Sequence, residues 1–142
     1  MRFMMLVPAN ADSEAGKMPP RELFEAMAAF NQEMIKAGVL LAGDGLAPSS
    51  KGKIVRFDAG GPTVIDGPFT ESKELIAGFM IWQVRSMEEA VEWVRRSPSH
   101  YEDSEVEIRP LFEAADFGEN LTPELEEQGR QLRDQVARKK NA

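Results

Sequence analysis

Two stretches of this chain, residues 2–7 and 78–84, are apolar at nearly every position. A strand in an antiparallel sheet with one wet face alternates apolar and polar residues, because successive side chains point to opposite faces. In the first stretch Met4 and Leu6 are apolar as well as Phe3 and Met5, and the second stretch follows the same pattern. We therefore expect both faces of the central sheet to be covered.

Two helices are predicted between the strands. The first begins at the Pro19-Pro20 pair and ends near residue 37, before Gly38, which is a typical C-terminal stop. The second is predicted over residues 87–96, with Ser86 as N-cap and Glu89 completing a capping box. The apolar stripe of the first helix is Leu23, Met27, Phe30 and Met34, and the inner face of the second is Met87, Ala90, Val91 and Val94.

The remaining strands are predicted at residues 39–42, at a hairpin over 53–57 and 63–65, and at 105–112, while residues 9–17 form a polar loop. With the hairpin counted as an addition, the element order is β-α-β-β-α-β. This is the ferredoxin-like plan, an α+β fold in which two helices cover one face of an antiparallel sheet.

Two helices leave the second face of such a sheet bare. A second subunit is the most economical cover, so we expect a homodimer with two sheets face to face. Trp93 lies about 120° from the inner stripe of its helix, which also predicts a contact with a partner. The chain's own C-terminal segment is the alternative cover.

The chain is predicted to divide into a domain at residues 1–114 and a helical extension at 115–142. Thr122 and Pro123 are typical of a helix start. The helix that follows is charged and carries only Leu125, Leu132 and Val136 as an apolar stripe. We expect it to dock on the body or on a partner subunit, and a role as a partner-binding helix is the alternative.

Composition excludes several classes of function. The 142 residues carry a net charge of −7, with no basic stripe, which argues against direct nucleic-acid binding. No apolar stretch approaches the length needed to span a bilayer, and the N-terminus turns polar too early for a signal peptide, so we expect a cytoplasmic protein. The chain has no Cys and one His, and no metal site is predicted. Residues 43–45 do not make a dinucleotide fingerprint, and no cofactor is expected.

Residues 66–74 (Asp-Gly-Pro-Phe-Thr-Glu-Ser-Lys-Glu) gather more ionisable groups beside a tight turn than any other part of the chain. Functional residues concentrate on loops held by a rigid scaffold. We predict Asp66, Glu71 and Lys73 as catalytic groups, with Asp66 as base or hydrogen-bond acceptor and the Glu–Lys pair as a route for proton transfer. Asp66 is also typical of a residue that shapes a turn, and the charges after it are also typical of a solvated surface.

A substrate-binding wall is predicted from Phe79, Trp82 and Arg109. If Ile108 meets the helices, Arg109 points to the opposite face, where its guanidinium can bind a carboxylate or form a structural ion pair. Phe79 and Trp82 are predicted to form the apolar wall, although aromatic residues in strands are commonly core residues. The sequence leaves the role of His100 open between surface and catalysis.

Residues 66–74, together with Gly78-Phe79, residues 41–43 and residues 106–110, resemble the YCII-related family in its DGPF-motif branch. The resemblance covers about residues 1–112, and the tail from residue 116 to 140 is similar to an extension carried by some members. It implies a dimeric α+β barrel, a fold shared with muconolactone-isomerase-like and dehalogenase-like enzymes. Genes of this branch often lie beside sigma factors of the extracytoplasmic-function type.

YCII proteins proper resemble enzymes because a His on the first helix lies near an acid. The matching region here, residues 25–28, has no His, so that chemistry does not transfer. Two hypotheses remain. One is a small cofactor-free enzyme or ligand-binding protein that acts on a small organic acid by proton transfer, as an isomerase or lyase does. The other is a non-catalytic regulatory protein associated with a sigma factor.

Overall fold

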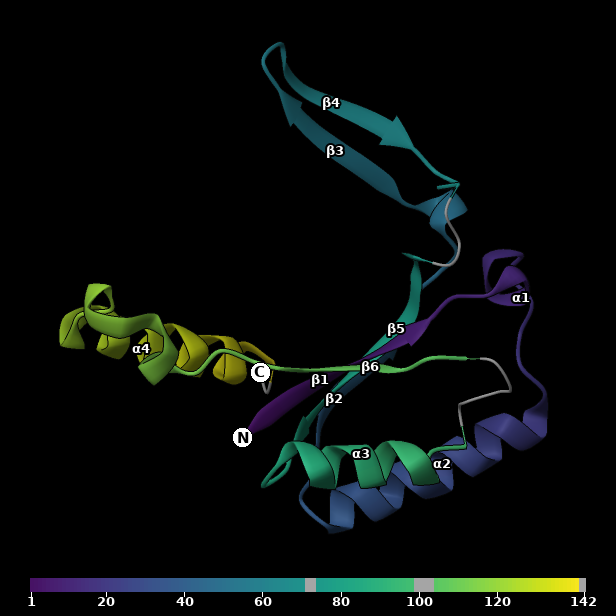
Figure 1. Cartoon of the computed structure of the whole chain (residues 1–142), viewed down its shortest axis with the longest axis horizontal. Helices are drawn as coiled ribbons and strands as arrows, with labels where there is room; N and C mark the ends of the chain where they lie inside the picture. The colour runs from purple at the N-terminus through teal and green to yellow at the C-terminus, as the bar shows by residue number, and fades with distance from the viewer. Residues whose placement is uncertain (71–73, 99–103, 141–142) are drawn as a thin grey trace. The chain divides into compact units, whose positions relative to one another are not determined.

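The computed structural model describes residues 1–70, 74–98 and 104–140, in two compact units, Met1–Pro110 and Leu111–Ala142. The first unit is built on a four-stranded antiparallel sheet with the strand order β2-β5-β1-β6 (Figure 1). Helices α2 and α3 connect β1 to β2 and β5 to β6, so the ferredoxin-like plan is confirmed. The bounds are β1 (Arg2–Pro8), α2 (Arg21–Lys36), β2 (Leu40–Gly45), β5 (Ile76–Gln83), α3 (Met87–Arg96) and β6 (Glu107–Pro110).

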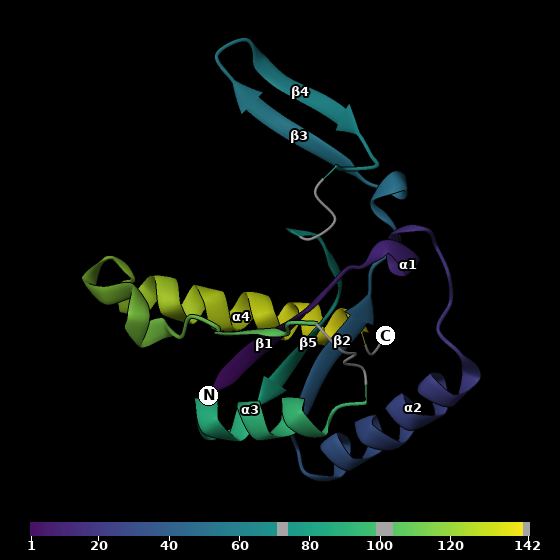
Figure 2. The same cartoon turned by 45° about the vertical axis from the view of Figure 1, so that its right-hand side comes forward.

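Both helices lie on the same face of this sheet, side by side (Figures 1 and 2). Phe3 and Met5 of β1 and Trp82 of β5 point to this face and are buried in the core cluster. Phe30 of α2 packs edge-on against Trp93 of α3, with ring centroids 5.9 Å apart. The helices are therefore held to each other as well as to the sheet.

The predicted orientation of α3 was wrong in two places. Trp93 is a core residue and not a free partner-facing one, whereas Met87 is exposed. The buried positions of α3 are Ala90 and Trp93, with Val94 packed beside them. A large indole ring reaches past the helix flank to Phe30, and Arg96 covers its other side with its guanidinium carbon 4.0 Å from the ring centroid.

The opposite face of the sheet carries the other set of apolar side chains. Met4 lies between Ile81 and Arg109 in the strand register, and Leu6 lies between Phe79 and Glu107. These four apolar side chains, Met4, Leu6, Phe79 and Ile81, are half-buried. We call them the open sheet face.

A separate two-stranded ribbon, β3 (Lys53–Asp58) and β4 (Gly61–Asp66), forms the predicted hairpin as an insertion between β2 and β5. The segment at residues 9–17, predicted as a polar loop, contains a short helix, α1 (Ala11–Glu14). Asn10 caps it in a reciprocal pair with Ser13, since each backbone N–H donates to the other's side-chain oxygen.

The second unit contains a 3-10 segment, η3 (Ala114–Asn120), and helix α4 (Pro123–Lys140). The terminal helix predicted from Thr122 and Pro123 is therefore present. Phe112 and Phe117 contact each other before the helix begins, with their rings tilted by 45° and their centroids 5.1 Å apart. No residue of α4 is buried.

Candidate functional site

The turn after β4 is held tightly against the segment around Ser49. Its Gly67–Pro68 peptide is cis, and the Gly67 N–H donates to the carbonyl oxygen of Gly52 at 3.1 Å. A Cβ placed on Gly67 would overlap the carbonyl oxygen of Ser49. Only glycine fits here, because the atom in the way belongs to the backbone and not to a side chain that could swing aside.

Ser49 joins three segments that are far apart in the chain. Its Oγ accepts the Phe69 N–H at 3.0 Å and donates to Oε2 of Glu14, while its own N–H donates to Oε1 of Glu14 at 3.1 Å. Ser49 starts the 3-10 turn η1 (Ser49–Lys51), and Glu14 is the last residue of α1. The arrangement fixes the Glu14 carboxylate beside the turn that carries Phe69.

A cleft of about 320 Å³ opens beside this junction. Its walls are mainly apolar, with Leu46, Pro48, Phe69, Leu75 and Ile76 as the larger side chains. The titratable groups that line it, among the described residues, are Glu14 and Lys51. A largely apolar concavity of this size with a few converging polar groups is typical of a site for a small ligand.

The run predicted to be catalytic, residues 66–74, meets the cleft through Phe69 and not through Asp66. Asp66 is paired with Lys53 across the hairpin, the side chains being 75% and 65% exposed, and it does not line the cleft. Phe69 of the same run does. The other two predicted catalytic residues, Glu71 and Lys73, lie outside the described residues, and so does His100.

The predicted binding wall is divided between the two faces of the sheet. Phe79 and Arg109 share the open sheet face, and Arg109 Nε lies 3.8 Å from Oε2 of Glu107. Trp82 points to the helix face and is only 2% exposed. Phe79 and Trp82 therefore cannot line one pocket within a single copy of the chain.

Trp82 lines a second, much smaller cavity on the helix face. It measures about 30 Å³, enough for one or two waters but not for an organic ligand, and Met5, Met80 and Val94 also line it. The indole Nε1–H of Trp82 is buried and has no hydrogen-bond partner among the described residues. A buried donor of this kind is commonly satisfied by water.

In residues 1–70, 74–98 and 104–140, no three His, Cys, Asp or Glu side chains lie together as metal ligands would. Over the same ranges, no helix combines the length and the apolar character that a bilayer crossing requires.

The fold and the cleft define a small α+β protein of ferredoxin-like topology with an inserted hairpin. The model of the YCII-related domain matches residues 1–115, and the chain belongs to the YCII-related family. An uncharacterised protein from Rhizobium meliloti (strain 1021) is 33% identical over 103 residues, which are 72% of this chain and 83% of that protein.

Among solved structures, 5-chloro-2-hydroxyhydroquinone dehydrochlorinase (TftG) from Burkholderia phenoliruptrix AC1100 aligns with a TM-score of 0.43 at 18% identity, in a complex with 2,5-dihydroxybenzoquinone. The alignment covers 81% of this chain and 98% of that one. At this level of likeness neither the activity nor the site residues carry over.

Proposed function

We propose that the chain is a homodimeric protein that binds a small organic acid in the cleft beside Gly67 and acts on it by cofactor-free proton transfer. The observation that carries this proposal is the pairing of one carboxylate and one ammonium group, Glu14 and Lys51, with a mainly apolar cleft. The ammonium group suits the carboxylate of a ligand, and the apolar walls suit its hydrocarbon or aromatic part.

Glu14 is the proposed base. An ionised carboxylate has about four acceptor positions, and Ser49 uses two of them, so acceptor capacity remains for a ligand. The two hydrogen bonds fix the carboxylate in orientation, which a general base requires. Proton removal next to a carbonyl or carboxylate leads to isomerisation if the proton returns at another carbon, or to elimination if a leaving group departs.

A thermal-shift screen of small carboxylates, lactones and aromatic acids tests the ligand class. A ligand present at 100 times its dissociation constant stabilises the protein by about 2.7 kcal/mol. We expect Lys51→Gln to weaken binding of the acid that binds best in the screen by about 1.5 kcal/mol, or roughly tenfold in dissociation constant, because the substitution removes a charged hydrogen bond. Lys36→Gln, at the exposed end of α2, is the matched control and should bind normally. If Lys51→Gln and Lys36→Gln bound the acid equally well, Lys51 would not be part of the binding site.

The catalytic role predicted for Asp66 has its own test. Asp66→Asn removes an exposed ion pair with Lys53 and should lower the free energy of unfolding by less than about 1 kcal/mol. If Asp66 takes part in the site, the variant also loses its stabilisation by ligand in the same thermal assay. If Asp66→Asn bound the ligand as well as the parent chain does, the role of Asp66 would be limited to its ion pair in the hairpin.

The homodimer rests on the open sheet face. Helices α2 and α3 occupy the opposite face, and four apolar side chains on the open one stay half-buried. A second copy placed sheet to sheet would bury them, and Phe79 and Arg109 would then lie at the interface.

A second candidate is a non-catalytic interaction protein. The exposed apolar stripe of α4 favours it, because such a stripe is typical of a helix that pairs with another protein surface. Association with a sigma factor stays a prediction of the family resemblance.

A further inference from the structure

Helix α4 carries an apolar seam that its own unit does not cover. Leu125, Leu132 and Val136 are 49%, 56% and 63% exposed, and Gly129 lies between them on the same side. The steps from Leu125 to Gly129, Leu132 and Val136 are four, three and four residues, which is the d-a-d-a spacing of a heptad repeat. A seam with this spacing matches the surface of another helix.

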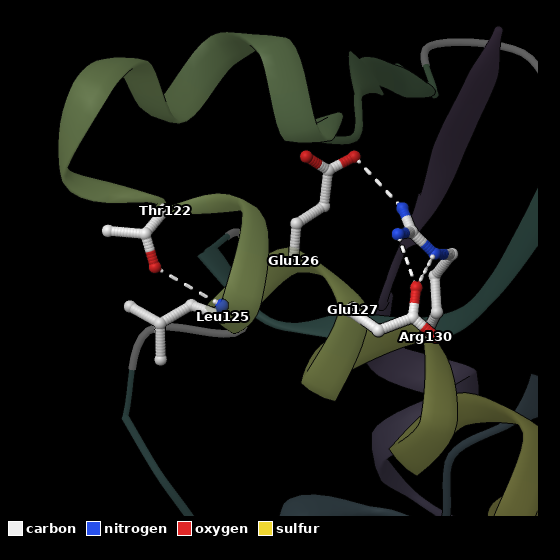
Figure 3. A network of polar contacts seen from close by, with 5 residues as sticks. All are labelled: Thr122, Leu125, Glu126, Glu127 and Arg130. Carbon is white, nitrogen blue, oxygen red and sulfur yellow. Dashed lines mark hydrogen bonds and ion pairs between the residues drawn. The ribbon is translucent and has the colours of Figure 1, made fainter.

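The helix is stabilised by contacts that leave this seam free (Figure 3). Thr122 Oγ1 accepts the Leu125 N–H at 3.2 Å and caps the first turn. Arg130 pairs with Glu126 at 3.1 Å and with Glu127. The hydrogen bond to Glu127 raises the pKa of Arg130 above its usual value. Each of these contacts joins residues three or four positions apart on the helix, and none of them covers the apolar side chains of the seam.

The charges of α4 are separated along its axis. Its first turn is acidic, with Glu124 and Glu126, and its last turn is basic, with Arg138, Lys139 and Lys140. Two copies placed parallel would bring like charges together at each end. Two copies placed antiparallel bring the acidic end of each helix to the basic end of the other.

We propose that α4 pairs antiparallel with α4 of a second copy of the chain. Leu125 then lies opposite Val136 of the second copy, and Gly129 lies opposite Leu132. Because Gly129 has no side chain, the leucine can approach the backbone there once the flexible Arg133 side chain swings aside; its Nη1 now lies 3.7 Å from where a Cβ on Gly129 would stand. This contact is independent of the ligand cleft and of the open sheet face.

The flanking positions agree with this register. In the heptad that places Leu125 at d and Gly129 at a, the e positions are Glu126, Arg133 and Lys140. Antiparallel helices bring e positions of the two copies together, so Glu126 faces Arg133 or Lys140 of the second copy. Glu127, at position f, points away from the seam.

The absence of native cysteine allows the register to be tested directly in the full chain. Leu125→Cys and Val136→Cys are introduced singly and together, and disulfide formation is followed on a non-reducing gel under mild oxidation. Within one helix the two positions are about 16 Å apart, beyond the reach of a disulfide, so a bond in the double variant must join two chains. We expect covalent dimers from the double variant and almost none from either single variant.

Other results would overturn the proposal. Covalent dimers from the single variants would mean a parallel pair, because identical positions then meet. No dimer from any variant would mean that the chain's own body or another partner covers the seam, or that it stays bare.

A charge-reversal series on the double-cysteine chain adds a second readout. We expect Glu126→Lys to reduce crosslinking and Arg133→Glu added to it to restore crosslinking, since the opposite charges then meet again. Glu127→Lys is the matched control because it also loses an ion pair with Arg130 but lies off the seam. Equal loss with both lysine variants would show an effect on the helix itself, and the proposed facing of Glu126 would be withdrawn.

Discussion

Replacing Gly67 with alanine is expected to lower the free energy of unfolding by about 3 kcal/mol, at the upper end of what an overpacked position costs. The added Cβ overlaps the carbonyl oxygen of Ser49. That oxygen cannot move without disturbing the hydrogen bond that the Ser49 N–H donates to Glu14 and the one that Ser49 Oγ accepts from the Phe69 N–H. The variant should therefore also lose its response to any ligand of the cleft. Chemical denaturation and the thermal-shift assay measure the two effects.

Gly45→Ala is the control for this substitution. A Cβ at Gly45 lies 3.9 Å from the carbonyl oxygen of Ala77, an ordinary contact, so the cost should stay within about 1 kcal/mol. If Gly67→Ala were as stable as Gly45→Ala, the turn would not be packed against Ser49 as described.

Replacing Ile81 with glutamate is expected to separate the proposed sheet-to-sheet dimer. A carboxylate buried without a partner costs at least about 2 kcal/mol, and a two-fold interface contains the change twice, so dimerisation weakens by about 4 kcal/mol, or about a thousandfold. All chains in this comparison also carry Leu132→Glu, so that the proposed α4 contact cannot hold two copies together. Light scattering at low concentration should then show a mass falling from twice 15.8 kDa towards 15.8 kDa. Circular dichroism should show that the fold is kept.

Gln83→Glu is the control, since it adds a charge on the same strand and the same face but at its exposed end. It should retain the dimer. A parent chain that is already monomeric at high concentration, or an Ile81→Glu variant that keeps its mass, would contradict the proposed use of the open sheet face.

The strands and helices were predictable because their periodicity is local. Apolar residues at nearly every position of 78–84 and the Ser86 cap predicted β5 and α3 closely. Periodicity does not account for how far a large side chain reaches. Trp93 lies off the inner stripe by helical angle, yet its ring reaches Phe30 and is buried.

The cleft was only partly predictable. The charges of residues 66–74 drew attention to the turn, but its contact with Ser49 is made by Gly67 and Phe69. Glu14 and Ser49 are 35 residues apart in the chain, and no local pattern connects them. The Asn10–Ser13 capping pair was the available signal, because it would have predicted the short helix that ends at Glu14.

The most direct test of the account is where a ligand binds. An isotope-labelled chain titrated with the best acid from the screen should show its largest amide shifts at Ser49, Gly52 and Phe69, around the cleft. Shifts centred instead on Phe79 and Arg109 would place the ligand on the open sheet face and contradict a site beside Gly67.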